Sequence, residues 1–191
     1  MLTSKSFVKI LTTNTISLFF LGSTFLLVST NKVLATPKTD FNNDGKSDIL
    51  WRNTSTGSNA IWLMNGGTVS SSPAITSIPN QSWKIVGTGD FNNDGKSDIL
   101  WRNTSTGDNA IWFMNGGTIS SSSNISSIPD QNWKIVGTGD FNNDGKSDIL
   151  WRNTSTGSNA IWFMNGGTVS SSSAITSIPD QNWKIVGTGQ N

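Results

Sequence analysis

Hydrophobic and polar positions along residues 40–189 follow a pattern that predicts strands and not helices. Two stretches, 99–103 and 110–114, are apolar on both alternating faces. Branched and aromatic residues favour strands, and a strand that hides both faces is expected inside stacked sheets. Residues 83–88 predict a further strand before these two. The serine-rich stretch 118–128 predicts a polar strand after them, at a solvent-facing edge.

This pattern returns every 50 residues along the chain. Three nearly identical repeats result: 40–89, 90–139 and 140–189. Turn signals at 104–107 and at 115–117, an Asn-Gly-Gly sequence, separate the four strands expected in each period. A period near 50 residues is typical of propellers and repeat arrays. The sequence therefore predicts an all-β fold, a β-propeller built of four-stranded blades.

The repeats are permuted relative to the predicted blades. The first repeat lacks the first strand of its blade, and the chain ends with a spare copy of that strand, residues 183–188. We expect this strand to complete a first blade, and in a cyclic dimer residues 183–188 of each chain complete the first blade of the other chain. Closed propellers have roughly four to eight blades, so three blades per chain predict a homo-oligomer, with a dimer of six blades favoured. An open arc, or a fragment of a longer array that needs a partner, is the alternative.

A nine-residue stretch, Asp-Phe-Asn-Asn-Asp-Gly-Lys-Ser-Asp, follows the first strand position of each period and occurs three times. Its oxygen-bearing side chains occupy alternate positions, so a curled loop could aim them at one point, and Gly45 supplies the bend. Calcium takes roughly six to eight oxygen ligands, and three carboxylates crowded into one loop favour a cation. An EF-hand is excluded, because Trp51 stands where the EF-hand requires Glu and because strands flank the loop.

The sequence thus predicts about three calcium ions per chain, one in each loop. The predicted ligands are Asp40, Asn42, Asp44, the carbonyl of Lys46 and Asp48; Asp90, Asn92, Asp94, the carbonyl of Lys96 and Asp98; and Asp140, Asn142, Asp144, the carbonyl of Lys146 and Asp148. We expect the ion to have a structural role, because these ligands nearly saturate calcium and no activatable nucleophile is nearby.

The N-terminal segment has the pattern of a signal peptide. Lys5 and Lys9 precede a largely apolar stretch, 16–28, and Ala35 supplies the small residue expected at the cleavage site. An uncleaved membrane anchor is the alternative, although the apolar run is short and interrupted. Three segments are therefore expected: signal peptide 1–35, linker 36–39 and propeller domain 40–191. We expect a secreted protein, periplasmic or extracellular, with no membrane attachment after cleavage.

Charge and composition exclude several classes of function. Three of the 13 basic residues lie in residues 1–35, which leaves 10 basic and 12 acidic residues in the rest of the chain. Nine of these acids belong to the three loops, and no basic patch is expected that would attract nucleic acid. Cysteine, histidine and tyrosine are absent, which removes disulfides, the usual general base and the usual nucleophile pairs. We predict that the protein is not an enzyme.

The sequence Thr-Gly-Asp-Phe-Asn-Asn-Asp-Gly-Lys-Ser-Asp, followed by Ile-Leu-Trp-Arg, resembles the FG-GAP and VCBS class of propeller repeat, which is related to the integrin alpha-subunit head. The resemblance covers residues 40–189. It implies a calcium ion in the loop between the first two strands of each blade, on the ligands named above, and a role in adhesion or carbohydrate recognition. The Phe-Gly and Gly-Ala-Pro signatures of that class are missing from this sequence. Asn43 stands where Gly is common, and Asn tolerates left-handed backbone.

Two classes of function remain open. The first is a lectin-like or adhesive module for glycans or cell-surface proteins. The residues that could contact such a ligand are Trp51, Arg52, Trp101, Arg102, Trp151 and Arg152. Core packing of the tryptophans, and pairing of each arginine with a loop Asp, are the alternatives for these residues. The second class is a calcium-rigidified scaffold without a ligand of its own. A glycan-active enzyme is the third alternative.

Overall fold

The computed structural model describes residues 16–21, 24–29 and 39–188. The chain divides into two compact units, 1–35 and 36–191. In the first unit, β1 (Ile16–Leu21) pairs antiparallel with β2 (Thr24–Ser29). The other residues of the expected signal peptide lie outside the described ranges. Every regular element in these ranges is a strand, so they contain no helix long and apolar enough to cross a membrane.

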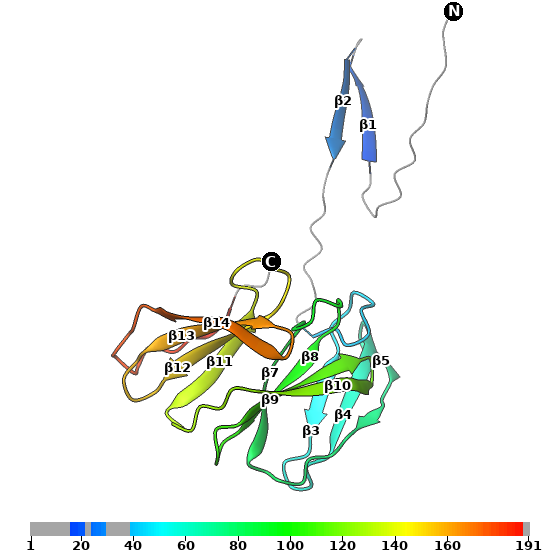
Figure 1. The fold of residues 1–191 in the computed structure, drawn as a ribbon. Coiled ribbons are helices and arrows are strands. Elements are labelled where there is room, and N and C mark those ends of the chain that lie inside the picture. The colour runs from blue at the N-terminus through cyan, green and yellow to red at the C-terminus, as the bar shows by residue number, and fades with distance from the viewer. Residues whose placement is uncertain (1–15, 22–23, 30–38, 189–191) are drawn as a thin grey trace, which may run out of the picture. The chain divides into compact units, whose positions relative to one another are not determined.

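The second unit holds three four-stranded antiparallel sheets, which follow one another along the chain (Figure 1). The first sheet contains β3 (Ile49–Arg52), β4 (Asn59–Asn65), β5 (Thr68–Ser71) and β6 (Ala74–Ile75). The second contains β7 (Trp83–Gly89), β8 (Asp98–Asn103), β9 (Asn109–Asn115) and β10 (Thr118–Ile125). The third contains β11 (Trp133–Gly139), β12 (Asp148–Asn153), β13 (Asn159–Asn165) and β14 (Thr168–Ile175). The predicted all-β fold is confirmed.

Strand order and register repeat between the second and third sheets. Both sheets run in chain order, with β7 and β11 at one edge and β10 and β14 at the other. Ile99 lies opposite Trp112 in the β8–β9 pair, and the β12–β13 pair repeats this register. The polar strand β10 ends at Ile125, earlier than predicted. The next carbonyl, that of Ser126, accepts a hydrogen bond from the Asn109 side chain at 2.7 Å, and Pro129 has no N–H to extend the ladder.

The first sheet is incomplete when it is compared with the other two. Its strands β5 and β6 together occupy the place of β10, because Pro73 stands between them where the second repeat has Ser123. Among the described residues the first sheet also has no counterpart of β7, so β3 is an unpaired edge. This edge strand spans four residues, whereas β8 and β12 span six each.

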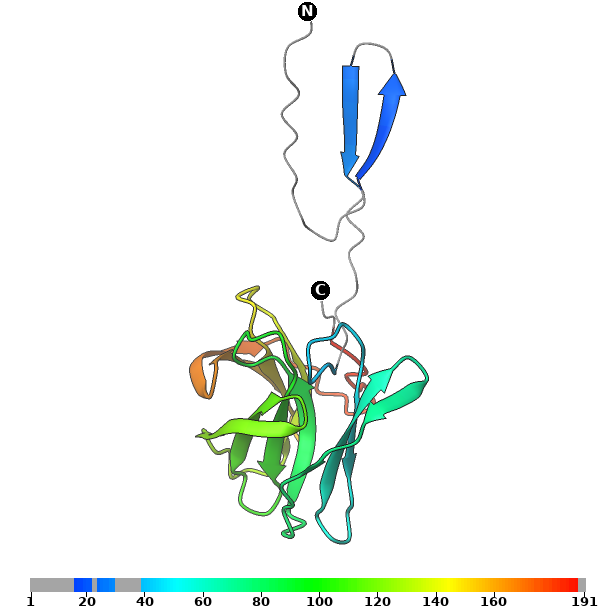
Figure 2. The same cartoon turned by 90° about the vertical axis from the view of Figure 1, so that its right-hand side faces the viewer.

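Neighbouring sheets pack against each other through two buried apolar clusters. One cluster joins the first and second sheets around Phe41 and Trp101, and the other joins the second and third sheets around Phe91 and Trp151. Figure 2 shows the first sheet, in cyan and teal, standing beside the second, in green. All residues of β8 and β12 are buried, as predicted for strands that hide both faces, whereas Trp51 in β3 is 47% exposed.

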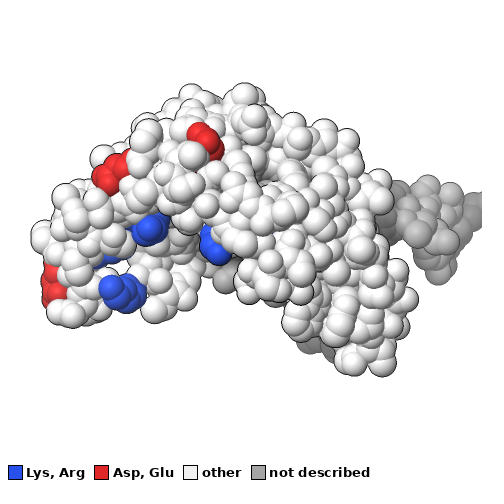
Figure 3. Space-filling model, turned by 90° about the horizontal axis from the view of Figure 1, so that it is seen from below, with Lys and Arg blue, Asp and Glu red and all other residues white. Residues whose placement is uncertain are grey.

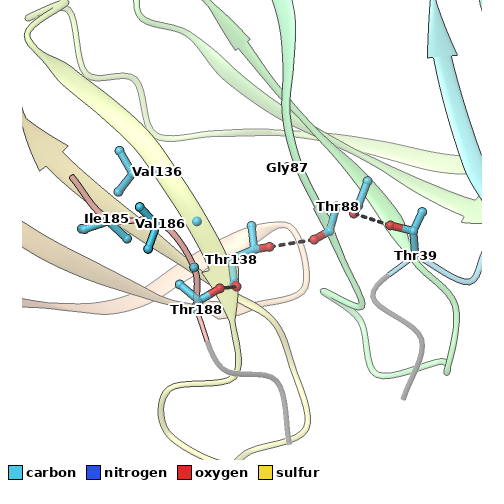
Figure 4. A pocket seen from close by; sticks show the side chains of 10 residues that line it. Thr39, Gly87, Thr88, Val136, Thr138, Ile185, Val186 and Thr188 are labelled. Atoms are coloured by element: carbon cyan, nitrogen blue, oxygen red, sulfur yellow. Dashed lines mark hydrogen bonds between the residues drawn. The ribbon is translucent and has the colours of Figure 1, made fainter. Parts of the chain in front are cut away.

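Residues 183–188 form no strand and do not pair with the first sheet of their own chain. They lie beside β11, where the Thr188 hydroxyl donates to the carbonyl of Thr138 at 2.6 Å (Figure 4). The segment therefore does not complete the first blade of its own chain, and the expected completion of that blade by a second chain stays a prediction. The physical reason is that the second and third sheets stand between this segment and β3.

Candidate functional site

The three Asp-rich loops lie next to one another at the same end of the three sheets (Figure 1). They lead into equivalent strands: 40–48 into β3, 90–98 into β8 and 140–148 into β12. Hydrogen bonds join each loop to the next. The Ser97 amide donates to the Asp40 carbonyl at 2.7 Å, and the Ser147 amide donates to the Asp90 carbonyl at 2.7 Å. The loops therefore form a continuous row across the unit.

Each loop curls because two of its residues adopt left-handed backbone. In the second loop, φ is 60° at Asn93 and 82° at Gly95, and the other two loops repeat these values closely. The prediction that Asn at this position accepts left-handed backbone is confirmed. A Cβ atom on Gly95 would also lie 2.7 Å from the side-chain nitrogen of Asn43 in the preceding loop. Glycine suits the bend because of its positive φ, and a side chain at Gly95 would also displace the end of the Asn43 side chain.

The carboxylate of Asp90 organises the interior of the second loop. Its two oxygens accept hydrogen bonds from the amides of Asp94 at 3.1 Å and Gly95 at 2.7 Å. The Asn92 side-chain oxygen also accepts from the Asp94 amide, at 3.1 Å, and the Asp94 carboxylate accepts from the Lys96 amide at 2.9 Å. The same bonds recur in the first and third loops. The oxygens at alternate positions thus turn toward the loop's own backbone.

Asp98 is buried and ties the loop to the sheet. Its carboxylate accepts hydrogen bonds from the amides of Phe91 at 3.0 Å and Met114 at 2.9 Å. Burial raises the pKa of Asp98 to about 7 against the lowering effect of these two bonds, and the carboxylates of Asp94 and Asp90 add to the rise. In the part of the chain that the structure describes, no lysine or arginine forms an ion pair with Asp98.

The donor chemistry of each loop suits calcium, but the carboxylates do not converge in this structure. Among the described residues, no three acidic, His or Cys side chains lie close enough together to hold a metal ion. Both oxygens of Asp98 serve backbone amides, and Lys46 pairs with Asp44 at 3.2 Å. A carboxylate oxygen that accepts one hydrogen bond keeps a second lone pair, so these hard oxygen donors fit a hard cation. The predicted metal ligands stay a prediction.

The tryptophan and arginine that follow the second and third loops are buried. Trp101 and Trp151 are 0% exposed, and Arg102 and Arg152 are buried with them. The Arg102 guanidinium donates to the carbonyl of Ile128 at 2.9 Å and lies over the Trp151 ring, 5.0 Å from its centroid. These arginines contact backbone carbonyls rather than a loop Asp, which corrects one of our expectations. None of the four side chains presents a surface that could contact a ligand.

The equivalent residues of the first sheet are more open. Arg52 bonds to the carbonyl of Ile78 at 3.0 Å and lies over the Trp101 ring at 5.0 Å, as Arg102 does with Ile128 and Trp151. Trp51, in contrast, is about half exposed, because no sheet within residues 39–188 covers it as the first sheet covers Trp101.

The chain matches the FG-GAP-like repeat family over residues 40–101 and 90–151, which together span more than half of its length. The protein belongs to the FG-GAP-like repeat family. The resemblance noted in the sequence is thereby confirmed. Each FG-GAP-like match begins at the first Asp of one loop and ends at the tryptophan that follows the next loop. No curated protein matches the chain.

Charges outside the loops are sparse in this FG-GAP-like protein. Figure 3 shows one face, most of it uncharged. Within the described ranges the two ion pairs, Lys46 with Asp44 and Lys96 with Asp94, both lie inside loops. The sheets are therefore joined by apolar packing and hydrogen bonds.

Sequence reasoning missed one feature, a hollow of about 290 Å³ between β7, β11 and residues 183–188 (Figure 4). Three threonines at the 50-residue spacing line it. The Thr138 hydroxyl donates to the Thr88 carbonyl at 2.7 Å, as Thr188 does to Thr138. The Gly-Thr-Gly sequence that recurs at 87–89, 137–139 and 187–189 was the available signal. The lining contains no charged side chain, so we assign the hollow no chemistry.

Proposed function

We propose that the protein is a calcium-stabilised β-propeller module that works outside the cytoplasm. The observation that carries this proposal is the row of three identical Asp-rich loops with the same internal hydrogen bonds at one end of three sheets. The residues proposed to hold calcium in the second loop are Asp90, Asn92, Asp94, the carbonyl of Lys96 and Asp98. The equivalent residues of the other loops would hold two more ions. The signal-peptide pattern of the N-terminal segment supports export, and calcium is abundant outside cells.

A bound cation would neutralise the mutual repulsion of three carboxylates in each loop. It would also stabilise the link between loop and sheet, because Asp98 already bonds to the Met114 amide in β9. The chemistry that calcium supplies here is structural, with no reaction attached. FG-GAP-like repeats are typically non-enzymatic, and we propose no catalysis.

Isothermal titration of the metal-free protein with calcium tests this function. We expect about three ions per chain, with Kd on the order of 10⁻⁴ to 10⁻³ M. The matched control is the triple variant Asp44→Ala, Asp94→Ala and Asp144→Ala. These carboxylates lie toward solvent and bond mainly within their own loop, so the variant should fold and bind calcium far more weakly. A folded wild-type protein that gives no calcium signal would refute the proposal.

For the module's biological role we propose adhesion or carbohydrate recognition. Trp62 is 37% exposed, and Trp112 and Trp162 are half-buried at the same place in the next two sheets. Aromatic rings with an open edge or face can pack against the apolar side of a sugar. Three weak sites on one chain would gain strength from multivalency. A glycan array with the wild type and with Trp112→Ala is the test, and binding of related sugars that drops in the variant supports this role.

A scaffold without a ligand of its own is the second candidate. The burial of Trp101, Arg102 and their third-sheet equivalents favours it, because these side chains are used entirely for packing. A glycan array without binding, together with calcium binding at three sites per chain, would favour the scaffold function over the glycan-binding function.

A further inference from the structure

Each contact between neighbouring sheets occurs twice in this chain, 50 residues apart. The two halves of a third such contact lie uncovered, one on the first sheet and one on the third sheet. The loop phenylalanines show this clearly. Phe41 and Phe91 are 0% exposed, whereas Phe141 is 39% exposed. The Phe91 carbonyl accepts from the Gly166 amide of the next sheet at 3.1 Å. By the same spacing the partner of Phe141 is Gly66, which lies in the first sheet.

The stacking of arginine on tryptophan is divided in the same way. Arg52 lies over Trp101, and Arg102 lies over Trp151, each at 5.0 Å. Among the described residues no tryptophan lies under Arg152, and no arginine lies over Trp51, which is about half exposed. The missing halves of this third contact are therefore the first sheet and the third sheet of the same sequence.

The first sheet also lacks a strand beside β3, and the C-terminal segment 183–188 has the sequence of such a strand but belongs to no sheet. Residues 183–188 have the same sequence as 83–88 in β7 and 133–138 in β11. Thr188 bonds to the β11 carbonyl as Thr138 bonds to the β7 carbonyl. The segment thus already occupies the place of the first strand of a next sheet. An edge strand such as β3, which has free N–H and C=O groups, readily accepts a strand from another chain.

We propose that a second copy of this chain binds head to tail, with residues 183–188 of one copy paired antiparallel to β3 of the other. The β7–β8 register places Ile85 opposite Trp101 and Thr88 opposite Ile99. The same register sets Ile185 opposite Trp51 and Thr188 opposite Ile49. Arg152 and Phe141 of one copy then pack on the first sheet of the other.

Such an interface joins two unlike surfaces, so it extends into a filament unless it closes. Each chain brings three sheets, and two copies bring six, which lies within the roughly four to eight sheets of closed propellers. We therefore assign the assembly as a closed ring of two copies. This inference rests on the contacts between sheets and not on calcium.

Engineered cysteines test the register, because the chain contains no natural cysteine. Chains with Ile49→Cys are mixed with chains that carry Thr188→Cys, and the mixture is oxidised. Opposed strand residues lie within the Cα separation of roughly 4.4 to 6.8 Å that a disulfide requires, so we expect a disulfide-linked two-chain product. The matched control is Val186→Cys, because its counterpart Val86 lies at the bulge and has no partner in β7–β8. The register is wrong if Val186→Cys forms the disulfide with Ile49→Cys as readily as Thr188→Cys does. It is also wrong if Thr188→Cys gives no linked product.

The mass in solution tests the assembly itself. The full chain, produced with its own N-terminal segment, is studied by sedimentation in calcium and in chelator. We expect twice the mass of one chain, and one-chain mass for a variant that lacks residues 183–191 but keeps its strand signal in circular dichroism. A single-chain mass up to about 100 µM, where a Kd near 10 µM would already show association, overturns the proposal. So does a deletion variant that still pairs.

The two proposals fail separately in these experiments. A two-chain mass without calcium binding leaves the assembly intact and refutes the metal proposal. A single-chain mass with three bound calcium ions does the reverse.

Discussion

Replacing the same phenylalanine in two repeats should have unequal effects on the stability of the single chain. Phe91 is 0% exposed and packs in the cluster with Leu100, Ile111 and Trp151, between the second and third sheets. Phe141 has the same sequence neighbours, yet it is 39% exposed because no fourth sheet covers it. Its amide donates to the carboxylate of the third loop just as the Phe91 amide does in the second, and neither alanine substitution removes this backbone bond.

The magnitudes follow from burial. Phe91→Ala deletes a fully buried ring and leaves a cavity, so the free energy of unfolding should fall by about 3 to 5 kcal/mol. Phe141→Ala removes a ring that is partly in water already and leaves an open notch instead of a cavity. Its loss is the transfer term for the covered part of the ring, about 1 to 2 kcal/mol. The expected difference between the two variants is therefore roughly 2 to 3 kcal/mol.

Urea unfolding followed by tryptophan fluorescence measures both values, at a protein concentration low enough to keep the chains separate. Phe41→Ala is the matched control, because Phe41 is buried like Phe91 and should give a similar loss. Equal losses for Phe91→Ala and Phe141→Ala at the lowest concentration would refute the reasoning, since they would mean that the third sheet is already covered. At higher concentration the cost of Phe141→Ala should grow if the second copy covers this ring.

Three further predictions concern calcium, a glycine and pH. Calcium at about 100 times Kd should stabilise the fold by roughly 2.7 kcal/mol per site, and an unchanged melting temperature in chelator contradicts this. Gly107→Ala should cost more than about 2 kcal/mol, because φ is +84° and the new Cβ would lie 2.0 Å from the Ile128 carbonyl oxygen; Gly116→Ala, at φ +60° in open space, should cost less in the same denaturation assay. A hydrogen bond from Ser127 holds the pKa of Asp108 below its usual range. Its stabilisation is therefore full above about pH 4 and is lost as the pH falls through the lowered folded-state pKa. The melting temperatures of the wild type and Asp108→Ser should converge in acid, and a constant difference contradicts the assignment.

The strands and loop bends could be predicted because they depend on local sequence. Branched and aromatic residues set β8 and β9, and Asn43 and Gly45 take the left-handed backbone that their residue types allow. Identical sequences cannot, however, reveal different surroundings. Trp51 and Trp101 have the same neighbours in sequence, and one is about half exposed while the other is fully buried. Position in the row of sheets decides between the two outcomes, and no residue type encodes that position.

The candidate site was predictable in its residues but not in its bonding. The pattern showed which oxygens a loop could gather. It did not show that the Asp98 carboxylate accepts hydrogen bonds from the Phe91 amide in the same loop and from the Met114 amide in β9. Nor did it show that Arg102 takes backbone carbonyls. Both contacts join residues that only the folded sheet brings together, so spacing along the chain gives no sign of them.

The uncovered surfaces of this protein lie on its first and third sheets because of the repeat architecture. A repeat that contacts only its neighbours needs one on each side, and among the sheets of residues 39–188 only the second has both. The first sheet lacks a strand beside β3, and the third lacks a sheet over Phe141. These two deficits are complementary, because each is half of a contact that the chain already makes twice. A second copy supplies both halves without any new kind of interaction, which is why we infer a copy of this chain, and not an unrelated protein, as the partner.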